Sequence, residues 1–203
     1  MAGERAELIL ASASSGRAAI LRGAGLDFRQ QSADIDERAL EAEAASGGEF
    51  DAGRLALMLA AAKAQDVSAR EPAALVIGAD QVMECGGVAY HKPATVEAAR
   101  RHLMQLRGKT HSLNAGLCVA RGGTVVWQHL DRAHLTMRDF SDDFLDAYCR
   151  SESETLLSTV GVYRIEGPGI QLFDKIEGDH HTIIGLPLLP LLGYLRDIGW
   201  LAS

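Results

Sequence analysis

Short apolar runs alternate along the chain with segments of helical periodicity, an order typical of an α/β protein. Residues 7–11 (ELILA) predict a short buried strand, and residues 18–25 predict a helix that ends at Gly23 or Gly25, with Ser14 or Ser15 as its cap. The continuous apolar run AALVIGA that follows Pro72 predicts a central strand covered on both faces, with Asp80 at its carboxyl end.

The remaining pattern predicts further helices and a hairpin. Helices are expected at residues 54–65, 95–106, 141–149 and 187–198. Residues 113–120 and 124–130 flank the turn Arg121-Gly122-Gly123 and predict a hairpin, and the alternation at residues 133–137 predicts a half-exposed strand. Residues 40–53 are rich in Ala, Glu and Gly, and we expect a mobile surface loop there. Hairpin and helix-crossover connections together predict a mixed sheet, with a ligand cleft at the carboxyl ends of its strands.

Composition and charge narrow the possible functions. The chain has 203 residues, 47% of them hydrophobic and 23% charged, as expected of one folded domain or one domain in two lobes. Its net charge is −7 and its Lys and Arg residues form no run, so binding to long nucleic acid is disfavoured. A small anionic ligand such as a nucleotide stays compatible with this charge, because a few basic groups in one cleft suffice to bind it.

We expect a cytoplasmic protein with reduced thiols. The N-terminus carries charged residues ahead of a short apolar stretch, unlike a signal peptide, and no stretch reaches the ~20 apolar residues that span a bilayer. The cysteines Cys85, Cys118 and Cys149 are far apart and show no metal-ligand spacing, so they predict small buried groups.

Two segments carry groups suited to phosphate chemistry. The turn from Ser12 to Arg17 (SASSGR) offers hydroxyls, backbone N–H groups and a guanidinium, although a capping serine beside a surface arginine explains the same letters. The carboxylates Asp34, Asp36 and Glu37, together with Asp80, can hold a divalent cation and activate water, or can simply start turns.

Basic and glycine-rich positions complete the candidates. Lys63 and Lys92 can each neutralise a polyphosphate, or can keep a surface solvated. The Gly-rich stretch around Glu166 permits a close approach to a planar base, or forms an ordinary turn. The adjacent His180 and His181 would diverge in an extended strand, so we do not expect them to share a metal ion.

Several segments of the chain resemble motifs of the Maf family and follow one another in the same order, over nearly the whole chain. The matching segments are LILASAS (8–14), GADQV (78–82), Lys92-Pro93, LRGKTH (106–111), IEGPGI (165–170) and IEGDHHTIIGLPL (176–188). Counted with the last two segments as one, these are five motifs in the correct order over about 175 residues, which makes the resemblance specific.

The resemblance implies a fold, an activity and a set of site residues. The fold is expected to be the Maf and inosine-triphosphatase-like α/β architecture, an elongated mixed sheet flanked by helices, with residues 1–203 forming a single domain of two lobes around a cleft. The activity is expected to be hydrolysis of a nucleoside triphosphate to the monophosphate and pyrophosphate, with Mg²⁺ or Mn²⁺ as cofactor and a homodimer as assembly. The family's site residues fall on the catalytic Asp80, the phosphate-binding Ser12, Ser14, Arg17, Lys63 and Lys92, and the metal ligands Asp80 and Glu37, with Asp36 beside Glu37 as the alternative.

Three positions bear on the preferred base. Gln81 and Glu166 are similar to the subgroup that acts on 7-methylguanosine triphosphate, and a carboxylate accepts two hydrogen bonds from the guanine edge. Gly16, however, replaces the aromatic residue usual in that subgroup, which removes a ring that could stack on a cationic base.

Other hypotheses remain open. One is a nucleotide-binding regulator of septum formation or cell-division arrest with little turnover, an association that the family also carries. Another is hydrolysis of inosine or xanthosine triphosphate on a related fold, and a polymer-binding module is disfavoured by charge.

Overall fold

The computed structural model describes residues 5–46 and 50–202, apart from the side chains of residues 153–155. The chain divides into two compact units. The first unit comprises Met1–Gln81, Asn114–Arg132 and Asp179–Ser203, and the second comprises Val82–Leu113 and Ala133–Gly178. Each unit is therefore assembled from segments that are distant in the sequence.

Seven strands of the described residues form one mixed sheet in the order β2-β1-β3-β5-β6-β7, with β4 paired to β3. The strands are β1 (Leu8–Leu10), β2 (Arg29–Gln30), β3 (Leu75–Cys85), β4 (Val88–Tyr90), β5 (Thr110–Arg121), β6 (Thr124–Met137) and β7 (Phe173–Glu177). Strand β1 is parallel to β2 and β3, whereas β4 is antiparallel to β3 and β7 is antiparallel to β6. The predicted mixed α/β class is confirmed.

Both units contain helices. Those of the first unit are α1 (Ser15–Gly23), α2 (Glu37–Ser46), α3 (Ala52–Arg70), α7 (His180–Ile184) and α8 (Leu188–Asp197). Those of the second unit are α4 (Val96–Leu106), α5 (Asp142–Ser151), α6 (Ser153–Ser158) and the 3-10 helix η1 (Pro168–Leu172). Side chains of the residues before α1, α4 and α5 cap these helices, as expected for Ser and Thr at such positions.

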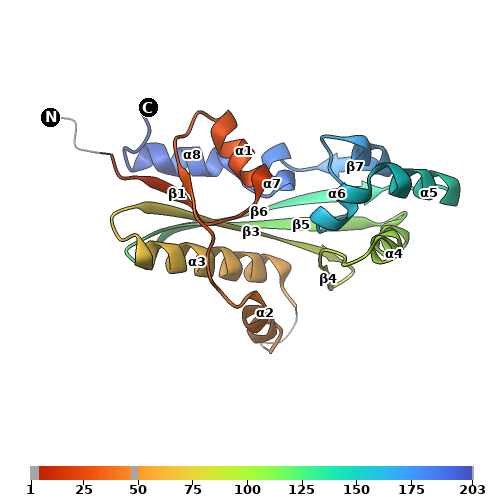
Figure 1. Cartoon of the computed structure of the whole chain (residues 1–203), viewed down its shortest axis with the longest axis horizontal. Helices are drawn as coiled ribbons and strands as arrows, with labels where there is room; N and C mark the ends of the chain where they lie inside the picture. The colour runs from red at the N-terminus through yellow and green to blue at the C-terminus, as the bar shows by residue number, and fades with distance from the viewer. Residues whose placement is uncertain (1–4, 47–49, 203) are drawn as a thin grey trace. The chain divides into compact units, whose positions relative to one another are not determined.

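The core of the first unit lies on both faces of its strands. Figure 1 shows α1 and α8 on one face and α3 on the other. Leu8 and Leu10 of β1 pack in the cluster that includes residues of α1 and α8, whereas Ile9 packs with Val67 of α3 and Val76 of β3. Because side chains alternate along a strand, a strand covered on both faces is apolar throughout, which is why its sequence showed a continuous run.

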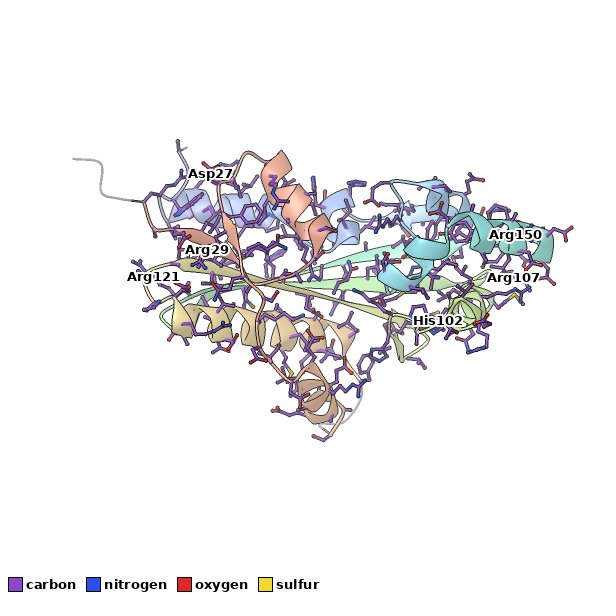
Figure 2. The ribbon with its side chains drawn as sticks, viewed as in Figure 1. Asp27, Arg29, His102, Arg107, Arg121 and Arg150 are labelled. Atoms are coloured by element: carbon purple, nitrogen blue, oxygen red, sulfur yellow. The ribbon has the colours of Figure 1, made fainter. Side chains whose placement is uncertain are left out.

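The second unit includes an arginine that joins two of its segments. Arg107, the residue after α4 (Figure 2), donates a 2.9 Å hydrogen bond to the carbonyl oxygen of Phe140 and lies 2.8 Å from the carboxylate of Asp142 in α5. The two contacts link the end of α4 to the start of α5.

Several predicted boundaries are wrong. Residues 40–46 and 52–53 belong to helices rather than a loop, while residues 47–49 lie outside the described residues. Ala and Glu are strong helix formers, and the carboxylate of Asp36 accepts the N–H of Ala39 at the start of α2, so this segment is helical although it is mostly exposed. The strand expected at 133–137 forms the last five residues of β6.

None of the described helices is both long enough and apolar enough to cross a membrane. Cys85, Cys118 and Cys149 are free thiols, as predicted, and the latter two are buried.

Candidate functional site

The turn between β1 and α1 holds its hydroxyl groups in a defined network. Ser12 is buried, and its Oγ accepts hydrogen bonds from the Ser14 N–H and from Nη1 of Arg17, each at 3.2 Å. Ser14 caps α1 by accepting the N–H of Arg17 at 3.3 Å. The amide of Gln30 donates to the carbonyl oxygen of Ser12 at 2.7 Å. The three predicted phosphate-binding residues of this turn, Ser12, Ser14 and Arg17, therefore lie together.

Arg17 connects this turn to a distant part of the sequence. Its Nε donates to the carbonyl oxygen of Gly185 at 2.9 Å, and its side chain is half-buried. Burial lowers the pKa of the guanidinium, while the negative charges of Asp80 and Glu37 act in the opposite direction. Since arginine is so basic that it stays protonated in proteins, the site carries a fixed positive charge within electrostatic range of both carboxylates.

Lys63 brings the carboxylates together. Its Nζ lies 2.5 Å from Oδ1 of Asp80 and 2.8 Å from Oε1 of Glu37. The side chains of Lys63 and Asp80 are only 12% and 14% exposed, against 52% for Glu37, so Lys63 and Asp80 form the shielded part of this cluster. A Cβ at Gly78 would lie 2.1 Å from the carbonyl oxygen of Ala60 in α3. Glycine there lets α3 approach β3 closely enough for Lys63 to reach Asp80.

The predicted position of Asp80 at the end of a strand is wrong. Strand β3 continues to Cys85, and its last three residues, from Met83 on, pair with β4. The parallel partner β1, however, ends at Leu10, whose pairing with Ile77 is the last between the two strands. The Ala11 N–H still donates to the carbonyl oxygen of Ile77 before the chain enters the Ser12 turn. Asp80 thus lies in the interior of β3, just beyond the carboxyl end of β1.

Asp36 and Glu37, the two alternative metal ligands, make different contacts. Asp36 accepts the Ala39 N–H through Oδ1 and so caps α2, whereas Glu37 pairs with Lys63. The N–H of Asp34 donates to the carboxylate of Asp66 at 2.9 Å. Among the three acidic residues, Glu37 is the one that contacts the cluster around Lys63.

Gln81 and Gly16 both lie against α7. The Gln81 amide nitrogen donates to the carbonyl oxygens of Thr182 at 2.9 Å and Ile183 at 3.1 Å. A Cβ at Gly16 would lie 3.3 Å from Cγ2 of Ile184, so the neighbour would have to shift slightly to admit a larger residue. With its nitrogen bound to α7, Gln81 has its carbonyl oxygen as the polar atom to offer a ligand.

Helix α7 was not predicted from the sequence. His180 and His181 were considered as neighbours in an extended strand, but they begin this helix, and the N–H groups of His181 and Thr182 donate to the carboxylate of Asp179. Gly185, with φ of +108°, ends it. An acidic cap followed by a glycine six residues later is a readable signal, which the β-branched residues between them obscured.

Two of the predicted site residues belong to the second unit. Lys92 is exposed between β4 and α4. Glu166 is exposed in the turn before η1, where the Gly167 N–H donates to the carbonyl oxygen of Arg164 at 3.3 Å. Their roles stay predictions.

The donor set of the first unit is compatible with a divalent cation. No group of three or more His, Cys, Asp or Glu side chains among the described residues could hold a metal ion. Mg²⁺, however, is usually bound through one or two carboxylates together with water and substrate phosphates. Asp80 and Glu37 already converge on one cationic group, the ammonium of Lys63. The residues present therefore fit a magnesium or manganese ion that arrives with a phosphorylated substrate.

Known proteins resemble this chain over most of its length. Residues 7–198 match the family described as "Maf-like protein". The chain is 50% identical over 190 residues to a Brucella abortus protein named 7-methyl-GTP pyrophosphatase, a match that covers 94% of this chain and 95% of that protein. It is 47% identical over 196 residues to a Nitrobacter winogradskyi protein named nucleoside triphosphate pyrophosphatase, covering 97% and 95%. A solved HAM1 protein from Coxiella burnetii is 13% identical, with a TM-score of 0.40, and the match covers 66% of this chain and 74% of that one.

Proposed function

The chain belongs to the Maf family, and from this premise we propose that it is a nucleoside triphosphate pyrophosphatase, which hydrolyses its substrate to the nucleoside monophosphate and pyrophosphate. The observation that carries the proposal is the cluster of Lys63, Asp80 and Glu37, within electrostatic range of Arg17. Relatives at 47% and 50% identity are named as enzymes of this class, which agrees with it.

The proposed mechanism assigns distinct tasks to the basic and acidic groups. Arg17, with its planar fork of donors, binds the phosphate oxygens together with Ser12 and Ser14, and Lys63 neutralises their charge. Asp80 accepts a proton from the attacking water as the new O–P bond forms at the α-phosphorus. The bond between the α-phosphorus and its bridging oxygen breaks, and pyrophosphate leaves. Phosphoryl transfer depends mainly on such positioning and charge stabilisation.

A divalent cation held by Asp80 and Glu37 would supply further neutralisation of the polyphosphate. Asp80 and Glu37 are bound to Lys63 in the structure, so the lysine has to share or release them when the ion and substrate bind. Removing the ion with a chelator should abolish turnover, and adding Mg²⁺ or Mn²⁺ should restore it. Activity that persists in excess chelator would overturn the metal proposal and leave the hydrolase proposal intact.

For the base, we propose a preference for 7-methylguanosine triphosphate. The Brucella abortus relative carries that substrate in its name. Glu166 would accept hydrogen bonds from the N1–H and amino group of the guanine edge, and its negative charge would favour a cationic base. Changing Glu166 to Gln should lower kcat/KM for this substrate more than for a pyrimidine triphosphate.

The experiment measures pyrophosphate release from 7-methylguanosine, thymidine, uridine and inosine triphosphates with Mg²⁺ or Mn²⁺ present. We expect release by the wild type and a fall in kcat/KM on the order of 10²–10⁴-fold in Asp80→Asn, the contribution typical of a general base. The matched control is Asp27→Asn at an exposed site (Figure 2), which should keep wild-type activity. Undiminished release by a folded Asp80→Asn protein would contradict the role of Asp80. Tight binding without release from any nucleotide would favour the regulatory hypothesis.

A further inference from the structure

Helix α7 contacts two of the candidate site residues through its carboxyl-terminal carbonyl groups. Gln81 donates to Thr182 and Ile183, and Arg17 donates to Gly185. The carbonyl groups at a helix carboxyl end lack partners within the helix and carry partial negative charge, so a cationic guanidinium and an amide N–H₂ group suit them. The orientation of both site side chains therefore depends on where α7 lies.

A helix of five residues cannot maintain this position by itself. Isolated helices of this length are unstable in water, and α7 must be held by contacts outside the helix. One such contact is polar: Oγ1 of Thr182, which is fully buried, donates to Oδ2 of the partly buried Asp131 at 2.7 Å. The other carboxylate oxygen of Asp131 accepts the N–H of Arg132 at 2.8 Å, which fixes the carboxylate against its own strand, β6.

We propose that Thr182 and Asp131 are positioning residues, which tie α7 to β6 and thereby orient Arg17 for phosphate binding and Gln81 beside Asp80. The inference rests on the proposed function and adds two residues that are not among the candidates named from the sequence. Neither residue needs to touch the substrate, because each acts through the carbonyl groups of α7.

Gly185 links the position of α7 to that of Arg17. Its φ of +108° lies in a region that other residues rarely adopt. A Cβ at this position would lie 3.5 Å from Nε of Arg17 and 3.6 Å from Cδ of Gln81, so both side chains adjoin the same backbone atom. A displacement of α7 would therefore affect Arg17 and Gln81 together.

The test compares Thr182→Val, which keeps the shape and removes the hydroxyl, with Thr182→Ser, which keeps the hydroxyl. Thr124→Val, at an exposed residue at the start of β6, is the matched control. In Thr182→Val we expect KM for 7-methylguanosine triphosphate to rise on the order of tenfold, the size expected for one hydrogen bond to a charged group. Thr182→Ser and Thr124→Val should keep KM within about threefold of wild type. A loss of folded protein alone would lower apparent kcat and leave KM unchanged, and that result would overturn the proposal.

A second readout is independent of turnover. The NMR signal of the Arg17 Nε–H group, identified by its absence in Arg17→Lys, reports the hydrogen bond to Gly185. We expect this signal to shift and to exchange faster with solvent in Thr182→Val, but not in Thr182→Ser. An unchanged signal in Thr182→Val would overturn the positioning role whatever the activity. If the signal shifts while the wild type hydrolyses no nucleotide, the proposed function fails and the positioning of Arg17 stands.

Discussion

Polar side chains have different kinds of partners in the two units. In the first unit, Lys63 lies between the carboxylates of Asp80 and Glu37, and the charged groups are partnered by opposite charges. In the second unit, Nε2 of His111 lies 2.7 Å from the hydroxyl of Tyr163, and both side chains are buried. Burial lowers the pKa of His111 to about 4 and raises the pKa of Tyr163, so this pair is neutral at physiological pH.

Only one of these two polar clusters is suited to chemistry. Desolvation disfavours an isolated charge, so a buried group without a charged partner becomes neutral, as His111 does. The hydrogen bond between His111 and Tyr163, whose rings both contact Phe173, joins neutral groups and contributes to stability. Charges that balance one another at a partly exposed site can exchange partners when a charged substrate arrives.

Replacing Arg17 by Ala should lower kcat/KM on the order of 10²–10³-fold, the loss typical of removing one preorganised donor to a developing charge. Arg17→Lys should recover only part of it, because lysine keeps the charge but lacks the fork that reaches both Ser12 and Gly185. Steady-state kinetics checks both variants, with the free energy of unfolding measured in parallel. A wild-type kcat/KM in Arg17→Ala would contradict the proposal that the first unit binds the phosphates of the substrate.

The neutral pair predicts a loss of stability in acid. The pKa of His111 is about 4 in the folded protein and near 6.5 when unfolded, so between these values the unfolded chain binds more protons. Stability should therefore fall as the pH drops from about 6.5 to about 4, by roughly 3 kcal/mol at most from this residue. Urea denaturation of the wild type and His111→Phe over this range measures the effect. The variant should lack this part of the pH dependence, and identical slopes for the two proteins would contradict the neutral buried state.

Glu37 should matter less than Arg17. In Glu37→Gln we expect the Mg²⁺ concentration for half-maximal activity to rise about tenfold, since a half-exposed carboxylate interacts with a cation through a high effective dielectric. A titration of activity with Mg²⁺ measures this shift, with Glu43→Gln on the exposed surface of α2 as control. An unchanged titration would leave Asp80 as the only proposed metal ligand.

The smallest effect is expected from Tyr163→Phe, which removes one hydroxyl from the second unit. The free energy of unfolding should fall by about 1 kcal/mol, the net contribution of one hydrogen bond. In the double variant with His111→Phe, the two effects should be less than additive, because the same bond is lost in both. Full additivity would show that the two side chains do not stabilise each other.

Much of the first unit could be predicted from the sequence, because its strands follow simple hydrophobic patterns. The strand containing Leu8 and Leu10 and the serine cap at Ser14 were both readable as local signals. The continuation of β3 beyond Asp80 was not, because its polar residues are stabilised by pairing with β4, a contact that local pattern does not report.

Candidate site residues could be named from the sequence only where each of them lies in a recognisable motif. Ser12, Arg17 and Lys63 were chosen through the resemblance to the Maf family, because their residue types alone fit a helix cap or a solvated surface as well as a phosphate site. Thr182 and Asp131 could not be chosen, because they are 51 positions apart and their link exists only once α7 meets β6. A threonine between apolar residues is typical of a strand, and nothing local marks it as a donor to a carboxylate.

Hydrolysis in ¹⁸O-labelled water tests whether Asp80 directs water to the α-phosphorus. Mass spectrometry of the products from 7-methylguanosine triphosphate would locate the label. We expect one ¹⁸O atom in the nucleoside monophosphate and none in the pyrophosphate, and a large loss of labelled product in Asp80→Asn. Label in the pyrophosphate, or a nucleoside diphosphate with orthophosphate as products, would rule out attack of water at the α-phosphorus.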